Sequence, residues 1–365
     1  MTLEDGRLRE LDSPSLNEDE AQAKITLRLA VAESSAGRYE EAFRLLGDAA
    51  ALFERSGNHA LRGMFHSELA AALQALGAAL RRPDYFDRAI VEYAAAVQHY
   101  GQARQELRVA TSEDSLAFLL YELGRYRDAH EHLDRAQAIL TRLKDAWTLA
   151  RVDETRARVL VAERRYRDAE RVVAGAVKTL EQGEASALLA DALTLQGVIW
   201  ARLWVYESSI EALRRAAEVA EAAGAPASAG RALLALVEEH GVSWRLRPEE
   251  VYEAYARADG LLRETRDVED VARLRACARV VMRRLTTAQF GDKNFSLPGA
   301  VHEFEAKLIE RALEETGGSL VAAARLLGVT HQTLGSILKS RHRQLAGKRK
   351  PPQRRLKSIV RDDKE

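Results

Sequence analysis

Gly124-Arg-Tyr-Arg-Asp-Ala129 is the stretch that decides the fold, because it is repeated along the chain. Close copies are Arg164-Arg-Tyr-Arg-Asp-Ala169 and Gly37-Arg-Tyr-Glu-Glu-Ala42, and weaker copies lie at residues 85–89 and 204–209. The copies end at residues 42, 89, 129, 169 and 209, so the successive steps are 47, 40, 40 and 40 residues. A nearly constant step of this size is the signature of an architecture built from stacked repeats.

A second small residue lies seven positions after the end of each copy. The sequence between the copies is rich in Ala, Leu, Glu and Arg, with apolar residues three to four positions apart, which favours helices over strands. Small residues at both positions allow two antiparallel helices to approach closely, and each pair leaves an apolar face that the next pair covers. The second positions are Ala49, Ala96, Ala136, Ala176 and Ala216, and a sixth, degenerate copy carries Pro248, Val251 and Ala258.

This pattern resembles the tetratricopeptide repeat, whose signature combines a Leu-Gly pair, a Gly-x-Tyr-x-x-Ala turn and a later small residue. Leu76-Gly77 and Gln196-Gly197 fall at the Leu-Gly position. The resemblance implies an all-α fold in which a tetratricopeptide-type α-solenoid covers residues 20–285 and a small helix-turn-helix domain follows. The helices should be longer than in the usual repeat of ~34 residues. The alternative is an irregular helical bundle with chance similarity, and the constant step of 40 residues argues against it.

The composition is that of a folded protein without disulfide bonds or membrane-spanning helices. Hydrophobic residues make up 47% of the 365 residues, and the single cysteine, Cys277, is expected to be buried in a protein from a reducing compartment. The N-terminus lacks the apolar segment of a signal peptide, and no run of 18 apolar residues occurs. We therefore expect a cytoplasmic protein. Residues 1–19 are expected to be a mobile acidic tail, and residues 286–298 have the composition of a linker.

A second informative stretch, Gly317–Ser340 with the sequence GGSLVAAARLLGVTHQTLGSILKS, predicts a helix, a tight turn and another short helix. If the first helix begins at Leu320, Ala324 lies where the helices cross closely, and Gly328 lies at the turn, where a positive φ is needed. This pattern is typical of a helix-turn-helix that binds DNA. The residues expected to be buried between the helices are Ala323, Leu327, Val329, Leu334 and Ile337.

The helix-turn-helix resembles the C-terminal DNA-binding domain of the Fis family, which NtrC-type activators share. The resemblance implies a Fis-type domain over residues 299–341 of a bacterial protein. The sequence departs from the family at Gly335-Ser336, where a large aromatic and a basic residue are usual, and this departure concerns affinity more than the class of ligand. The matching groups are Phe304-Glu305, Leu308-Ile309, Ala312-Leu313, Thr316-Gly317-Gly318, Ala323-Ala324, Leu326-Leu327-Gly328-Val329, Thr333-Leu334 and Leu338-Lys339.

Polar side chains of the second helix are placed to contact DNA. Thr330 would cap this helix, and His331, Gln332 and Thr333 lie in its first turn, which enters the major groove in this motif. Gln332 can pair with adenine, and Thr333 can contact a thymine methyl group or a phosphate. The alternative is a set of ordinary solvent-facing side chains on a protein-binding helix pair. The predicted DNA-binding residues are Thr330, His331, Gln332, Thr333, Ser336, Lys339, Arg341 and Arg343.

Charge is distributed unevenly, although the formal net charge is zero. Residues 301–365 contain 14 Lys and Arg against 8 Asp and Glu, and residues 341–365 contain 10 against 3. We therefore expect residues 342–365 to be a flexible basic tail that neutralises phosphates without recognising sequence. The acidic remainder would repel nucleic acid and confine contact with double-stranded DNA to this end of the chain.

The repeat array is expected to bind a partner on its concave face, which the first helices of the repeats line. A peptide or protein segment is the expected ligand, and the alternative is a solvated face with internal ion pairs. The side chains of Trp147, Trp200 and Trp204 are expected to pack between repeats instead. The predicted partner-binding residues are Asp114, Tyr121, Arg151, Glu154, Arg158, Asp191, Arg202, His240 and Trp244.

No motif predicts an enzyme, a cofactor or a metal site. The sequence contains no G-x-x-x-x-G-K-[ST] motif, so the resemblance to NtrC-type activators does not extend to an ATPase. His130 and His132 are two residues apart and therefore lie on different helix faces, which excludes them as a metal-binding pair.

The sequence thus predicts a sequence-specific DNA-binding transcription regulator whose repeat array binds a partner or mediates assembly. The alternative is a tetratricopeptide adaptor that binds no DNA and whose C-terminal helices contact protein. RNA is disfavoured, because its deep, narrow major groove excludes the helix. A homodimer is expected, because helix-turn-helix proteins usually contact two half-sites. Val301, Phe304, Leu308 and Ala312 form an apolar stripe that would serve as the interface or pack on its own recognition unit.

Overall fold

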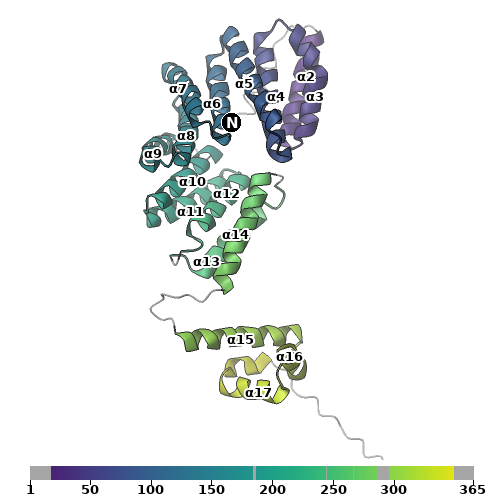
Figure 1. Cartoon of the computed structure of the whole chain (residues 1–365), viewed down its shortest axis with the longest axis vertical. Coiled ribbons are helices and arrows are strands. Elements are labelled where there is room, and N and C mark those ends of the chain that lie inside the picture. Colours follow the sequence, from purple (N-terminus) through teal and green to yellow (C-terminus); the bar gives the residue numbers. More distant parts are fainter. Residues whose placement is uncertain (1–17, 184–185, 244, 266, 287–295, 349–365) are drawn as a thin grey trace, which may run out of the picture. The chain divides into compact units, whose positions relative to one another are not determined.

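The computed structural model describes residues 18–183, 186–243, 245–265, 267–286 and 296–348 (Figure 1). The chain divides into two compact units, Met1–Leu285 and Thr286–Glu365. Every regular element of the described residues is a helix, which confirms the expected all-α fold. Within the part of the chain that the structure describes, no helix is long and apolar enough to cross a membrane.

The first unit is an α-solenoid in which consecutive helices pack as antiparallel pairs, followed by α14 (Val268–Thr286). Proline begins three of the helices, where its fixed φ suits the first turn and its missing N–H is not needed. The pairs are α2 (Glu18–Ser35) with α3 (Tyr39–Arg55), α4 (His59–Leu80) with α5 (Pro83–Gln102), α6 (Glu106–Glu122) with α7 (Tyr126–Leu143), α8 (Ala146–Ala162) with α9 (Tyr166–Leu180), α10 (Ala187–Arg202) with α11 (Tyr206–Ala222), and α12 (Pro226–His240) with α13 (Pro248–Leu261).

The repeat anchors that the sequence predicts are confirmed as the places where helices meet. Each copy of the motif forms the turn and the start of the second helix in its pair, and the last residue of each copy is buried. The small residue seven positions later is buried in every repeat as well, including Ala258 of the degenerate sixth copy. The Leu-Gly position is equally tight, because a Cβ atom added to Gly197 would lie 2.6 Å from Leu213 Cγ.

The first helices of the pairs form the inner layer of the array. In addition to its partner in the pair, α6 packs on α8, α8 packs on α10, and α10 packs on α12. Because these helices are closer to one another than the second helices are, the side chains they expose form the concave face, as in other solenoids. This arrangement places the predicted partner-binding residues of α6, α8 and α10 on one continuous layer.

The second unit is a small helical domain. It comprises α15 (Leu297–Glu315), α16 (Leu320–Leu326), α17 (His331–Ser340) and the 3-10 helix η1 (Arg343–Lys348). The expected linker therefore overlaps the ends of α14 and α15 at its two margins, and its residues 287–295 lie outside the described residues. Residues 1–17 of the expected acidic tail and residues 349–365 of the expected basic tail also lie outside them.

Candidate functional site

The second unit is built around one core that joins all of its helices. The helices α16 and α17 pack on each other, α15 packs on α16, and η1 packs on α17 and α15. Ala323 and Ala324 are buried at the crossing of α16 and α17, as the small residues there predict. The buried residues of this core are Ile309, Ala312, Leu313, Ala323, Ala324, Leu334, Leu338 and Leu345.

One of the predicted core positions is wrong. Val329 is 37% exposed, because it lies in the turn just before the cap of α17, where its N–H bonds to the Ala324 carbonyl and its side chain faces solvent. Leu338 fills the core instead and is fully buried. Its position four residues after Leu334, on the same helix face, is the sequence signal that identifies it.

The turn and the cap of α17 have the geometry that the sequence predicts. Gly328 has a φ of 68°, a left-handed conformation that glycine adopts without steric cost. The Thr330 hydroxyl accepts a hydrogen bond from the Thr333 N–H at 3.1 Å, and the two threonine hydroxyls lie 2.8 Å apart. The Thr333 hydroxyl is thus engaged in the cap, which leaves its methyl group as the free part of the side chain.

All eight predicted DNA-binding side chains are exposed. The side chains of His331 and Gln332 make no hydrogen bond to another described residue, and both residues follow directly on the cap of α17. Arg341 lies 3.5 Å from Glu305, and Arg343 donates to the Lys339 carbonyl at 2.9 Å, so both guanidinium groups are held beside the end of α17. One side of this helix therefore carries a continuous row of polar and basic groups.

The boundary between the domain and the expected basic tail is wrong. Residues 342–348 belong to the folded unit, because η1 packs on α15 and α17 and its Leu345 is buried. Lys348 donates to Glu310 at 2.6 Å and to Glu314 at 2.7 Å, and these two hydrogen bonds raise the pKa of Lys348. His342 is fully buried as well, although its neighbours in the sequence are basic and predict an exposed position.

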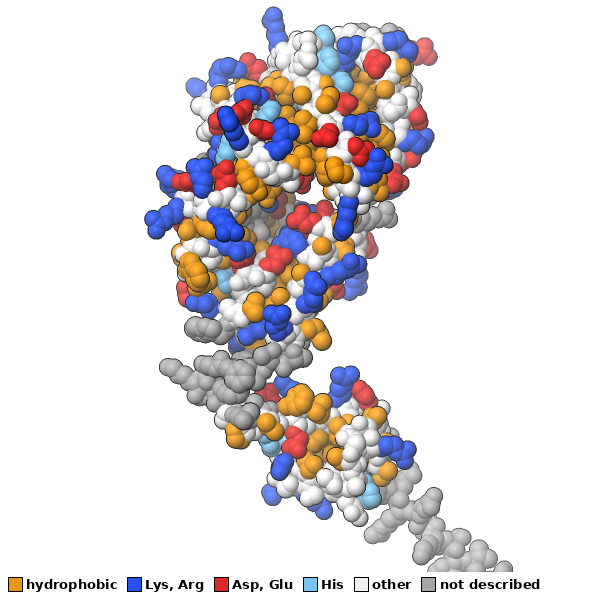
Figure 2. Space-filling view, viewed as in Figure 1, with side chains coloured by type: hydrophobic (Ala, Val, Ile, Leu, Met, Phe, Trp, Pro, Cys, Tyr) orange, Lys and Arg blue, Asp and Glu red, His pale blue; other side chains and the backbone are white. Residues whose placement is uncertain are grey.

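The apolar stripe of α15 is exposed along most of its length. Phe304 is 64% exposed, and Val301 and Leu308 are exposed beside it on the same helix face. Ala312 is the exception: it is buried in the core of its own unit and does not extend the stripe. Figure 2 shows hydrophobic side chains gathered on the surface of this unit.

The inner layer of the array brings several predicted partner-binding residues together as charged pairs. Arg151 Nη2 on α8 lies 3.3 Å from Asp114 Oδ2 on α6, and Glu154 pairs with Arg158 one turn further along α8. Burial raises the pKa of the Asp114, Glu154 and Asp191 carboxyl groups. Asp114 Oδ1 and Arg151 Nε are buried without any hydrogen-bond partner among the described residues.

The other predicted groove residues differ in how far their side chains are exposed. Tyr121 is half-buried, and Arg202 is exposed and donates to Glu239 at 2.8 Å. His240 is wrong as a contact residue, because it is fully buried and its Nε2 lies 2.8 Å from the Ser209 hydroxyl. Trp244 lies outside the described residues.

The tryptophans follow the packing prediction only in part. Trp200 is half-buried and its indole N–H donates to Glu170 at 3.0 Å, and the Trp147 ring lies against Gly183 of the next turn. Trp204 is wrong: it is 77% exposed and has a φ of 67°. It occupies the left-handed turn position that Gly124 occupies in another repeat, so its side chain projects away from the helix pair.

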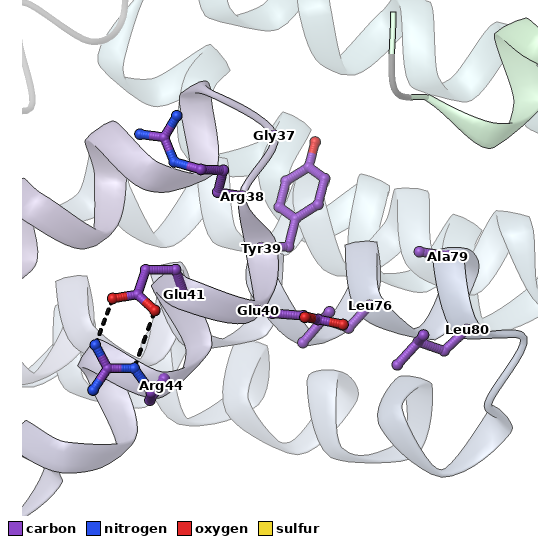
Figure 3. Close-up of a pocket in the computed structure, with 9 residues that line it drawn as sticks. All are labelled: Gly37, Arg38, Tyr39, Glu40, Glu41, Arg44, Leu76, Ala79 and Leu80. Atoms are coloured by element: carbon purple, nitrogen blue, oxygen red, sulfur yellow. Dashed lines mark hydrogen bonds and ion pairs between the residues drawn. The ribbon is translucent and has the colours of Figure 1, made fainter.

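The structure also contains clefts outside these two regions. The cleft in Figure 3 has a volume of about 550 Å³ and lies between the α2–α3 turn and the end of α4. Its charged groups satisfy one another, since Arg44 donates to Glu41 and Asp48. None of the residues that line it has a buried polar side-chain atom without a hydrogen-bond partner.

Two further predictions concern chemistry. His130 lies 3.2 Å from Glu163, while His132 pairs with Glu113 on α6, so the two histidines lie on different helix faces, as their spacing predicts. Cys277 is fully buried, as predicted, and burial raises the pKa of its thiol to about 12, which leaves it protonated and unreactive at neutral pH.

Comparisons with known proteins agree with both units. Residues 300–339 match the Fis family of bacterial regulatory proteins. The solved structure of a Rap protein complexed with Competence and Sporulation Factor has a TM-score of 0.50 and 16% identity, and covers 90% of this chain and 99% of that one. The apo form of RapI has a TM-score of 0.47 and 12% identity, and the match covers 89% of this chain and 96% of that one. BtubC from P. vanneervenii has a TM-score of 0.47 and 18% identity, and the match covers 61% of this chain and 92% of that one.

No curated protein matches the chain. At 16% identity, the complexed Rap protein supports an argument about the fold alone. Together with the family match, the likeness confirms a tetratricopeptide-type helical array followed by a Fis-type helix-turn-helix.

Proposed function

We propose that the chain is a bacterial transcription regulator that binds double-stranded DNA through α17. The observation that carries the proposal is the first turn of this helix. Thr330 caps it, and the side chains of His331 and Gln332 are exposed and not engaged elsewhere in the described residues. The Fis-family match over the same residues supports the same function.

The geometry of α17 assigns different roles to its side chains. With its N-terminus in the major groove, Gln332 can form a bidentate pair with adenine N6 and N7. Ser336 and Lys339 follow at one-turn spacing and face the groove and the phosphate backbone. Arg341 and Arg343, held beside the end of the helix, neutralise phosphates and fix the register of the unit.

A pair of glutamine variants tests this assignment. We expect Gln332→Ala to reduce discrimination between the selected duplex and a duplex with one changed base pair by about 1–3 kcal/mol. Gln344, which is exposed on η1 and outside the recognition helix, provides the matched control, and Gln344→Ala should change nothing. The binding site is first selected from random duplexes with the full-length protein. Equal discrimination by both variants would contradict the assigned role.

We also propose that the inner layer of α6 and α8 binds a peptide or protein segment. A Rap protein of similar fold is known in complex with Competence and Sporulation Factor. The observation on this chain is the pair of buried Asp114 and half-buried Arg151, in which Asp114 Oδ1 and Arg151 Nε lack a hydrogen-bond partner among the described residues. Buried polar atoms without partners are costly, and a peptide backbone supplies both a donor and an acceptor.

Neutral replacements of similar size test the groove. Peptides are selected from a random display library on the full-length protein, and their affinities are measured by calorimetry. We expect the double variant Asp114→Asn/Arg151→Gln to bind the selected peptides at least about tenfold more weakly, the loss of roughly one charged hydrogen bond. The control is Glu106→Gln/Arg142→Gln, which neutralises an exposed pair 3.0 Å apart. A library that yields no peptide, or equal binding by both variants, would overturn the proposal.

The exposed stripe of Val301, Phe304 and Leu308 favours self-association of the C-terminal unit. A homodimer would present two recognition helices to two half-sites, which is the usual mode of this motif.

The same stripe also favours the second candidate function, an adaptor that binds protein only. A mass of one chain by light scattering, with and without duplex, would contradict the dimer, and duplex binding would contradict the adaptor.

A further inference from the structure

Three side chains that commonly bind metal ions meet in the C-terminal unit. His302 and Glu305 lie three residues apart on α15 and so share one helix face, and His342 follows the end of α17. One ligand atom from each of the three lies within 4.8 Å of the other two. The rings of His302 and His342 are stacked, with centroids 4.2 Å apart. None of these groups takes part in the proposed contacts with DNA.

The buried member of the cluster has one ring nitrogen without a hydrogen-bond partner among the described residues. His342 is fully buried, and its Nε2 lies 2.9 Å from Glu305 Oε2. Its Nδ1 has no hydrogen-bond partner among the described residues. Arg341 lies near the other carboxylate oxygen, at 3.5 Å, and helps to hold Glu305 in place. A buried ring nitrogen that is left without a partner costs free energy, which a bound ligand at the cluster could offset.

We propose that His302, Glu305 and His342 bind a divalent transition-metal ion of the zinc class. Two imidazole nitrogens and a carboxylate oxygen form a three-ligand set that Zn²⁺ accepts, with water in the fourth position. Nitrogen ligands disfavour Mg²⁺ and Ca²⁺, which take oxygen.

The distances are close to those that such an ion requires. Ligands at ~2.1 Å from a tetrahedral ion lie roughly 3.4 Å apart. The 2.9 Å between His342 Nε2 and Glu305 Oε2 is somewhat shorter than this value, and a ligand atom of His302 lies within 4.8 Å of one on each of the other two residues. The ion would join the start of α15 to the segment that directly follows the recognition helix. It would therefore fix the end of α17 against the rest of the unit.

The test counts zinc ions bound by the full-length protein, with a chromophoric chelator as competitor. His59 and His99 also meet, with their Nδ1 atoms 3.1 Å apart, so variants are compared with one another instead of relying on the total. We expect His302→Ala to bind one zinc ion fewer than the wild type. Glu305→Gln should lower the affinity for that ion roughly 100-fold or more, because even a change outside the direct ligands lowers metal affinity about 10–100-fold. His302 is exposed, so its replacement leaves the core intact.

The matched control is His130→Ala, because His130 also pairs with a glutamate but belongs to no group of three potential metal ligands among the described residues. This variant should bind as many ions as the wild type. Co²⁺ gives a second readout, because a tetrahedral site produces strong visible absorption that His302→Ala should remove. An equal number of bound ions in the wild type and in His302→Ala would overturn the proposal, as would an equal cobalt spectrum.

Discussion

Leu334→Ala is expected to abolish DNA binding by unfolding the C-terminal unit. Leu334 is fully buried in a core of few side chains, and removal of a buried leucine side chain costs about 2–5 kcal/mol. A unit this small has little stability in excess of that loss. The experiment measures duplex affinity of the full-length variant, together with amide hydrogen exchange of residues 320–338.

Leu326 provides the matched control for this variant. It lies in the same unit but is 59% exposed, so Leu326→Ala should preserve both the exchange protection and the affinity. The two leucines therefore separate loss of the fold from loss of an apolar side chain as such. Wild-type protection of residues 320–338 in Leu334→Ala would show that the core is not organised around this residue.

Gly197→Ala is expected to destabilise the repeat array by about 1–3 kcal/mol, the usual cost of forcing an extra carbon into a packed interface. The new Cβ would lie 2.6 Å from Leu213 Cγ and 3.2 Å from the Ser209 carbonyl oxygen, so α10 and α11 would have to move apart. The hydrogen bond from the Ser209 hydroxyl to the Gly197 carbonyl crosses the same interface and would be strained. Thermal unfolding followed by circular dichroism measures the effect.

Gly175→Ala should have the opposite effect on the stability of the repeat array. Gly175 is exposed on α9 and has nothing within 4 Å of an added Cβ, so alanine there should stabilise the helix by about 0.5–1 kcal/mol. A lower midpoint for Gly197→Ala and an unchanged or higher one for Gly175→Ala are the predicted results. Equal shifts in the same direction would mean that the Leu-Gly position does not bring the two helices together.

The sequence predicted the array well because its constraints are local and repeated. An anchor such as Ala129 must be small wherever two helices touch, so the same residue type recurs at a constant step and is visible without a structure. The helix-turn-helix was predictable for a similar reason. The turn at Gly328 and the cap at Thr330 depend on backbone geometry within a few residues.

The predictions that failed depend on contacts between residues far apart in the chain. His240 has the spacing of a groove residue, but it is buried and forms a hydrogen bond with Ser209, which lies 31 residues earlier in the chain. His342 lies among basic residues and was assigned to the tail, yet α15 buries it next to Glu305. Trp204 failed for a different reason: a backbone in the left-handed region turned an apolar side chain outward.

The central claim is that the C-terminal unit binds duplex DNA, and fluorescence anisotropy of a labelled duplex at two salt concentrations tests it most directly. If Lys339, Arg341 and Arg343 neutralise three phosphates, affinity should fall roughly 40-fold between about 50 and about 200 mM salt, from a slope of about −0.9 per phosphate. Tight binding at low salt with at least this loss is the predicted result. Absence of binding at about 50 mM salt would contradict the claim.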